Sequence, residues 1–175
     1  MAHGLRDERQ RENTMARIER IMFPTDFSEA SSAAIPWVVR MGRMTGAQIF
    51  VVHVLREDPE AGPDPNYHYL VPEYARHLEA DAKAKLHQVA DCLPKDLKVE
   101  TVLSHGDVTD QILKMVKSHQ IDLIVMATRG ESGWLSLLFG SVAEKVIKLA
   151  DCPVLSIRKP FPKEDEASDT PPTAA

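Results

Sequence analysis

The sequence has little of what marks membrane, secreted or fibrous proteins. It holds only two cysteines, Cys92 and Cys152; these are too few for a disulfide scaffold and predict two reduced, mostly buried thiols in a cytoplasmic protein. No uninterrupted apolar run approaches the length of a membrane span, and the polar N-terminal stretch has no signal-peptide core. Lysine and arginine form no cluster of the kind that binds nucleic acid. We therefore expect a cytoplasmic protein that binds neither membranes nor nucleic acids.

What the sequence does have suits one domain of ordinary size. Its 175 residues are 43% hydrophobic and 27% charged, with a formal net charge of −5, which leaves enough apolar side chains to bury a core. Three stretches lack the pattern of a packed element: a polar arm at 1–17, a proline-rich excursion at 57–72, and a disordered, acidic, proline-rich tail at 160–175. The predicted domain therefore spans residues 18–159.

Within this domain the apolar pattern alternates between two periods. Short runs dense in apolar and β-branched residues predict five strands, at 18–24, 48–55, 98–103, 121–127 and 153–159. Apolar residues at helical spacing predict intervening helices at 28–46 (kinked at Pro36), 74–89, 106–116 and 141–150. This alternation predicts an α/β fold: a single doubly wound domain with a five-stranded parallel sheet and helices on both faces.

Two strand ends carry residues suited to a ligand site, because ligands of such sheets bind beyond the carboxyl ends of the strands. The first predicted strand ends in Pro24-Thr25-Asp26, which brings a carboxylate to that edge. The fourth is followed by glycines at 130, 133 and 140 and by Ser141, which opens a helix whose N-terminus favours phosphate. The alternative interpretation is a loop with glycines at its turns and a serine that caps the last helix.

The better-known phosphate and metal motifs are absent from the sequence. No lysine follows Gly140, which excludes a P-loop, and no G-x-G-x-x-G follows a strand. The seven histidines are scattered, and none has metal-ligand spacing with a cysteine or a carboxylate. No side-chain metal site is predicted, and His53 in the second strand is expected to be a buried, hydrogen-bonded histidine.

Three segments together resemble the universal stress protein family: PTDFS after the first strand, HVL at the end of the second, and MATRGESGWLSLLFGSVAEKVIKLADCPVLSIR. The resemblance runs from Ile18 to Arg158 and implies the adenine nucleotide alpha hydrolase-like fold. Some members of this family bind ATP or related adenine nucleotides, and others bind none. The nucleotide motif is Gly, two residues, Gly, nine residues, Gly, then Ser or Thr. Gly130, Gly140 and Ser141 match it, and Ala127 stands where the first glycine would be.

Carried over by position, the resemblance implies a nucleotide site with two ends. The phosphates would contact Gly130, Gly140, Ser141 and the backbone of Val142 and Ala143. Arg129 is also expected to contact a phosphate oxygen, because of its positive charge and its position beside Gly130. The base and ribose would contact Pro24, Thr25, Asp26, the backbone of Val54, Met126 and Ala127. If position 127 needs a positive φ, its alanine costs about 1 kcal/mol; if glycine is there for closeness, the methyl group only trims affinity.

The resemblance implies a universal stress protein that binds ATP or another adenine nucleotide, with Mg²⁺, and regulates the stress response through nucleotide state. Efficient catalysis is not expected, because no base, P-loop lysine and metal-binding carboxylate occur together; slow ATP hydrolysis stays open. Other members also imply a protein partner and a homodimer through the C-terminal edge strand, at Val154, Leu155 and Ile157. The alternative is a nucleotide-free homodimeric interaction module with the site impaired at Ala127.

The apolar run at 134–139 has two interpretations. It is either a lid that packs on the protein's own sheet or a contact surface for a second subunit or another protein.

Overall fold

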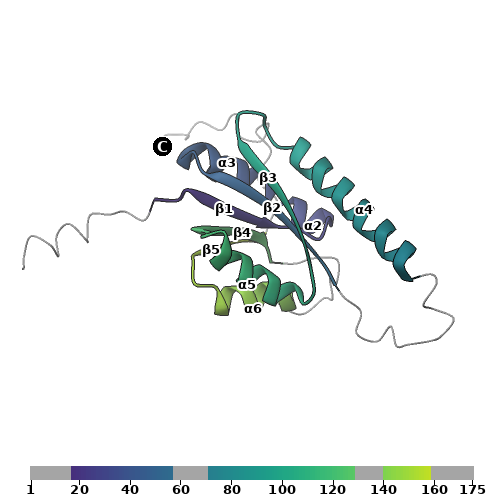
Figure 1. Ribbon diagram of the computed structural model, residues 1–175. Helices are drawn as coiled ribbons and strands as arrows, with labels where there is room; N and C mark the ends of the chain where they lie inside the picture. Colours follow the sequence, from purple (N-terminus) through teal and green to yellow (C-terminus); the bar gives the residue numbers. More distant parts are fainter. Residues whose placement is uncertain (1–16, 57–70, 129–139, 159–175) are drawn as a thin grey trace, which may run out of the picture.

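A computed structural model describes residues 17–56, 71–128 and 140–158, in which a five-stranded parallel sheet forms the centre (Figure 1). The strands lie in the order β3-β2-β1-β4-β5. Their bounds are β1 (Arg20–Pro24), β2 (Gln48–Leu55), β3 (Lys98–His105), β4 (Leu123–Ala127) and β5 (Val154–Ile157). The strand predicted last in the chain therefore lies at an open edge of the sheet.

Helices cover both faces of this sheet, which confirms the predicted doubly wound fold. The helices are α2 (Glu29–Ser32), α3 (Ile35–Thr45), α4 (Val71–Asp91), α5 (Val108–Ser118) and α6 (Ser141–Leu149). In Figure 1, α5 and α6 lie side by side below the sheet, and α3 and α4 lie above it. Strand order reverses between β1 and β4, so a crevice is expected at the carboxyl ends of these two strands.

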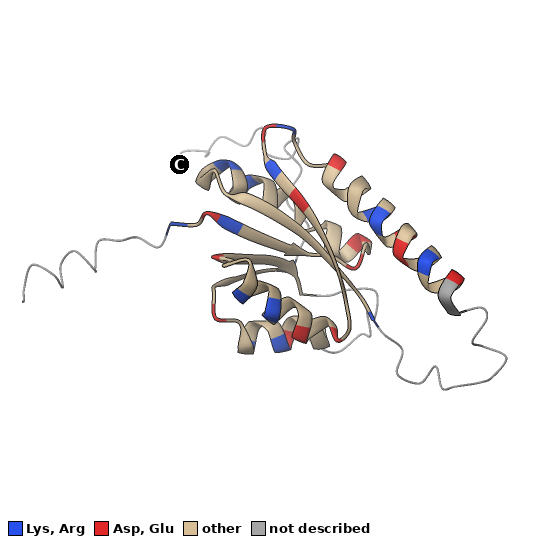
Figure 2. Ribbon diagram, viewed as in Figure 1, with Lys and Arg blue, Asp and Glu red and all other residues tan. Residues whose placement is uncertain are grey.

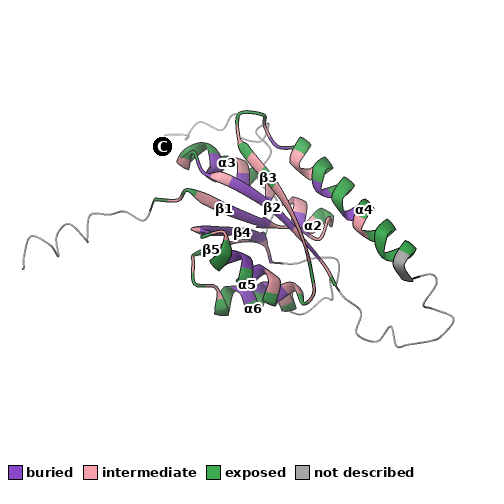
Figure 3. Ribbon diagram, in the orientation of Figure 1, coloured by how far each residue is buried: buried purple, intermediate pink, exposed green. Residues whose placement is uncertain are grey.

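Each strand contributes alternate side chains to two separate core layers. In β1, Ile21 and Phe23 pack with Val38 of α3 and Leu86 of α4, whereas Met22 packs with the opposite layer of α5 and α6. Figure 3 shows the same pattern, with buried residues along the strands and exposed residues on the outer faces of the helices. Because both faces are covered, the central strands consist mostly of apolar residues.

The predicted first helix is not one kinked helix but two separate helices. Helix α2 ends at Ser32 and α3 begins at Ile35, with Pro36 in the first turn of α3. A proline in a first turn loses no helical hydrogen bond, whereas the same residue in a helix interior would break one. The chain therefore breaks before Pro36. Helix α3 ends at Gly46, whose φ of 70° is left-handed.

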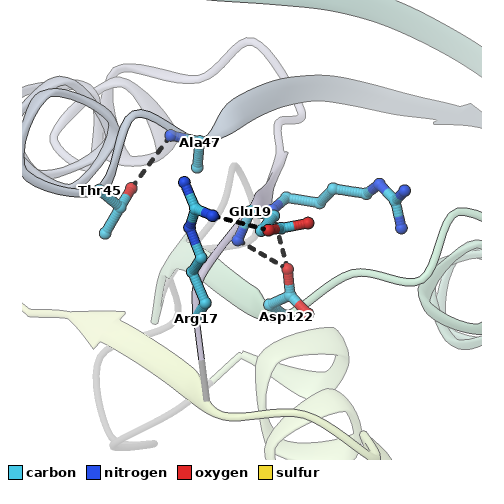
Figure 4. Close-up of polar contacts among 6 residues, drawn as sticks. Arg17, Glu19, Thr45, Ala47 and Asp122 are labelled. Atoms are coloured by element: carbon cyan, nitrogen blue, oxygen red, sulfur yellow. Dashed lines mark hydrogen bonds and ion pairs between the residues drawn. The ribbon is translucent and has the colours of Figure 1, made fainter. Parts of the chain in front are cut away.

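A carboxylate ties the beginnings of β1 and β4 together at the amino end of the sheet (Figure 4). Asp122 Oδ2 accepts hydrogen bonds from the backbone N–H groups of Glu19 (2.8 Å) and Arg20 (2.9 Å). The Asp122 N–H in turn donates to the Arg20 carbonyl oxygen at 2.9 Å. Hydrogen bonds of Asp122 therefore join β1 to β4 at the amino end of the sheet, and the pocket lies at the carboxyl end.

The expectation of two mostly buried thiols is wrong for Cys92, which is exposed beyond the end of α4. Cys152 is half-buried, and burial, with smaller effects of Asp122 and Asp151, raises the pKa of its thiol.

None of the helices in the described part of the chain has the length and apolar character of a membrane span. Figure 2 shows Lys and Arg interleaved with Asp and Glu over the helices in that view.

Candidate functional site

A pocket of about 440 Å³ opens at the carboxyl ends of β1, β2 and β4, beside the first turn of α6. This volume lies within the usual range for small-molecule sites. The lining residues come from six elements and their loops: Pro24, Thr25, Asp26, Ser31, Val52, His53, Val54, Leu55, Arg56, Val108, Ile112, Met126, Ala127, Thr128, Gly140, Ser141, Val142 and Ala143.

The structure brings together every predicted site residue that it describes. Around this one pocket lie Pro24, Thr25, Asp26, Val54, Met126, Ala127, Gly140, Ser141, Val142 and Ala143. The remaining two predicted residues, Arg129 and Gly130, lie outside the described residues, as does the apolar run at 134–139. That these residues bind a nucleotide stays a prediction at this point.

The first turn of α6 presents backbone donors to the pocket. Gly140 has an extended backbone (φ −69°, ψ 154°), and its N–H donates to the Thr128 carbonyl oxygen at 2.7 Å. The first backbone hydrogen bond within α6 comes from the Glu144 N–H, which donates to the Gly140 carbonyl oxygen at 3.0 Å. The N–H groups of the three residues between them have no acceptor within the helix. With roughly half a positive charge at this terminus, they suit an anion such as phosphate.

The loop after β1 holds Asp26 at the pocket in a fixed conformation. Asp26 Oδ1 accepts hydrogen bonds from the N–H (3.1 Å) and the Oγ (2.6 Å) of Ser28. Phe27, between them, has a φ of 66°, which is unfavourable for a residue with a Cβ atom. Its N–H donates to Thr25 Oγ1 at 3.0 Å, which holds this turn closed. Strain of this kind persists only where the surroundings enforce it, and it is common at binding sites.

His53 supports that loop from β2. Its Nδ1 lies 2.8 Å from the Thr25 carbonyl oxygen, and its ring centroid lies 4.2 Å from that of Phe27. Because a carbonyl oxygen only accepts, Nδ1 must carry the hydrogen. The predicted hydrogen bond is present, but His53 is half-buried rather than buried and forms part of the pocket wall.

Ala127 causes no backbone strain at the position where the nucleotide motif has glycine. It is the last residue of β4, paired in register with Ile157 of β5. The residues with a Cβ atom and a positive φ in the described chain are Phe27 and Gln120, and Ala127 is not among them. Of the two consequences considered from sequence, only the added methyl group at the pocket wall applies.

Sequence reasoning missed eight pocket residues, and half of them share one origin. These four lie at or just after the carboxyl end of β2, of which only Val54 was predicted as a contact: Val52, His53, Leu55 and Arg56. Val108 and Ile112 come from the apolar stripe of α5, which was interpreted as core. The available signal was the HVLR sequence at the end of a buried strand, where the chain leaves the sheet beside the predicted crevice.

Side-chain metal coordination finds no support in residues 17–56, 71–128 and 140–158. No group of three or more His, Cys, Asp or Glu residues in these ranges is arranged to hold a metal ion. A Mg²⁺ ion that entered with a nucleotide would have the phosphates themselves as its main ligands, as Mg²⁺ commonly does.

Comparisons with known proteins identify the family. The sequence pattern of the universal stress protein family matches residues 17–158. A universal stress protein of Methanocaldococcus jannaschii is 32% identical over 143 residues, which covers 81% of this chain and 83% of that protein. The structure of UspA from Lactobacillus plantarum has a TM-score of 0.65 at 27% identity, covering 82% of this chain and 99% of that one.

A universal stress protein from Archaeoglobus fulgidus, solved in complex with dAMP, has a TM-score of 0.58 at 21% identity and covers 81% of this chain and 98% of that one. That likeness shows the shared fold. The family match, in contrast, extends over all of the described residues, including Asp122, the pocket and the edge strand β5. This chain belongs to the universal stress protein family.

Proposed function

We propose that this protein binds ATP or a related adenine nucleotide in the pocket at the carboxyl end of the sheet. The observation that carries the proposal is the first turn of α6, whose amides have no acceptor within the helix and line a pocket of suitable size with partly apolar walls. In this role the protein acts in the cytoplasm as a stress-response regulator that responds to nucleotide state.

The two ends of the pocket fit the two ends of such a ligand. Val54, Val108, Ile112 and Met126 supply apolar surface for a purine base. Asp26 supplies a carboxylate, which is a good acceptor for ribose hydroxyl groups. The backbone amides after Gly140 would hold phosphate, and Mg²⁺, bound to the phosphates, would supply neutralising charge. The dAMP complex in the family agrees with an adenine nucleotide, although at 21% identity it supports the fold rather than the contacts.

The pocket residues favour binding over efficient catalysis. The described lining includes one cation, Arg56, and a single carboxylate, that of Asp26, whose Oδ1 already accepts two hydrogen bonds from Ser28, so no second acid is present to divide metal binding and base catalysis. Fast phosphoryl transfer depends on a cation at the transferred phosphate, a metal-binding carboxylate and a positioned base or water together. We therefore expect a bound nucleotide to be hydrolysed slowly, if at all.

A homodimer through β5 is part of the same proposal. This strand is at the edge of the sheet, next to β4 only, and an open edge can pair with a second copy. The predicted contacts are Val154, Leu155 and Ile157. A protein partner that senses the bound nucleotide would complete the regulatory role.

A nucleotide-free interaction module is the second candidate function. The supporting observation is alanine at position 127 together with the open edge of β5, which would serve association with or without a ligand. The absence of backbone strain at Ala127 favours the nucleotide-binding function over this candidate.

Calorimetric titration with ATP and Mg²⁺ tests the proposal, with Gly140→Val as the disrupting variant. Valine at this position places a branched side chain beside the amides that would hold phosphate, so we expect binding to be lost. Ala150→Val is the matched control, because Ala150 ends the same helix with a similar extended backbone (φ −70°, ψ 137°) away from the pocket. Equal binding by Gly140→Val and the control would contradict the proposal, provided that thermal unfolding shows both variants folded.

A further inference from the structure

A second pocket, of about 470 Å³, continues from the first between the N-terminal turns of α5 and α6. We call it the α5–α6 pocket; its lining residues are Arg56, Gly106, Asp107, Val108, Thr109, Ser141, Val142 and Lys145. It shares Arg56, Val108, Ser141 and Val142 with the nucleotide pocket. A ligand that reaches Ser141 in the first pocket can therefore extend into the second.

Two cations, Arg56 and Lys145, line this second pocket. In the part of the chain that the structure describes, neither Arg56 nor Lys145 forms an ion pair. Lys148, three residues further along α6, is paired with Glu144 at 2.7 Å. The acid in the lining, Asp107, caps α5 by accepting a hydrogen bond from the Asp110 N–H at 3.0 Å. The charge of the lining is therefore positive on balance.

Thr109 supplies a hydroxyl group that can bond a ligand in this pocket. Its side chain lines the α5–α6 pocket, is only 5% exposed, and has no hydrogen bond among the described residues. The hydroxyl groups of Thr25, Ser31 and Thr128, which also belong to buried residues, do form hydrogen bonds: Thr25 and Ser31 with each other, and Thr128 with the Ile157 carbonyl oxygen. No buried side-chain oxygen in the described residues lacks a partner, so the Thr109 oxygen is open to the pocket and can donate a hydrogen bond to an acceptor that enters it.

We infer that the α5–α6 pocket binds a phosphate group of the same nucleotide, beyond the phosphate held at the start of α6. Lys145 and Arg56 supply opposite charge, and the Thr109 and Ser141 hydroxyl groups supply donors, which together match a phosphate. The inference rests on the proposed function and restricts the ligand to nucleotides with more than one phosphate. The protein selects nucleoside diphosphates and triphosphates over monophosphates, because a monophosphate does not reach this pocket.

The test compares dissociation constants for AMP, ADP and ATP by calorimetry, with Mg²⁺ present throughout. Lys145→Gln and Thr109→Val alter residues that line the second pocket and not the first, and valine keeps the shape of threonine. We expect the wild type to bind ATP at least about tenfold tighter than AMP. In the double variant this ratio falls toward one while AMP affinity stays unchanged, because charge-assisted bonds to a distal phosphate are lost.

Lys148→Gln is the matched control, since it removes the same charge from the same helix outside the pocket. A nucleotide ratio that is the same in the double variant and the wild type overturns the inference, as does an equal loss of AMP and ATP affinity. Both outcomes leave the proposed function standing. Failure of the wild type to bind any of the three nucleotides at millimolar concentration contradicts the proposed function itself and removes the inference with it.

Discussion

Position 127 decides how the nucleotide motif of this chain should be interpreted. Alanine there has an ordinary strand backbone, so replacing it with glycine relieves no strain in φ. What Ala127→Gly removes is one methyl group from the pocket wall. We expect ATP affinity to rise, but by less than about tenfold, or about 1.4 kcal/mol. Titration of the variant against the wild type measures this.

The same substitution has a cost in the strand. Glycine inside β4 gains freedom in the unfolded chain, so we expect the free energy of unfolding to fall by about 0.5–1 kcal/mol. A variant that binds ATP when the wild type does not would show that the methyl group alone closes the site. In that case the nucleotide-free module would be the correct description of the natural protein.

The predicted site residues follow from the sequence wherever position along a strand determines them. Pro24, Thr25 and Asp26 end a strand beside the point where strand order reverses, so the fold alone places them at the crevice. Thr109 and Lys145 were not predictable in this way. Thr109 lies on α5 and Lys145 on α6, so they line one pocket only because these two helices pack together. That packing cannot be predicted from a local sequence pattern.

At the scale of elements, Asp122 joins β1 to β4 at the end of the sheet opposite to the pocket. Its carboxylate accepts two backbone hydrogen bonds, from Glu19 and Arg20. Asp122→Ala leaves both donors without this acceptor, and we expect a loss of about 2 kcal/mol in the free energy of unfolding. Urea denaturation monitored by circular dichroism measures the loss.

Asp96→Ala is the control for this prediction. Asp96 also bonds a partner distant in sequence, Arg43 Nε at 3.0 Å, but both side chains are more than half exposed. Exposed ion pairs contribute little, so this variant should be clearly less destabilised than Asp122→Ala. Equal losses in the two variants would contradict the role assigned to Asp122.

Element boundaries show where sequence reasoning is sufficient and where it is not. The strand at Gln48–Leu55 was predicted with its observed bounds, because a run dense in apolar and β-branched residues matches a strand buried on both faces. The helix around Pro36 was predicted as one kinked element, and the chain instead forms two helices. The apolar spacing from Ala30 to Met41 continued across the break and so concealed the interruption.

At the scale of the whole molecule, the open edge of β5 predicts how two copies associate. The carbonyl oxygens of Pro153 and Ile157 accept hydrogen bonds from β4, from the N–H groups of Ile124 and Thr128 at 3.0 Å each. Because backbone groups alternate in direction along a strand, Val154 and Ser156 point theirs to the open edge. A second copy would pair with these groups.

Ser156→Pro tests this association, because it removes an outward N–H and leaves the pairing with β4 intact. We expect the wild type to be a dimer and Ser156→Pro a folded monomer, with Ser156→Ala as a dimeric control. Size-exclusion chromatography with light scattering measures the mass of each. A monomeric wild type, or a Ser156→Pro variant that remains dimeric, would contradict association through β5.

Nucleotide binding is the central claim, and the most direct measurement is to identify what the purified protein carries. The protein is purified under mild conditions and denatured, and the released small molecules are identified by mass spectrometry, with ATP and Mg²⁺ titrated into any empty fraction. We predict released ATP or another adenine nucleotide, or micromolar binding that Gly140→Val abolishes. No released nucleotide, together with no binding heat up to millimolar ATP, would contradict the account.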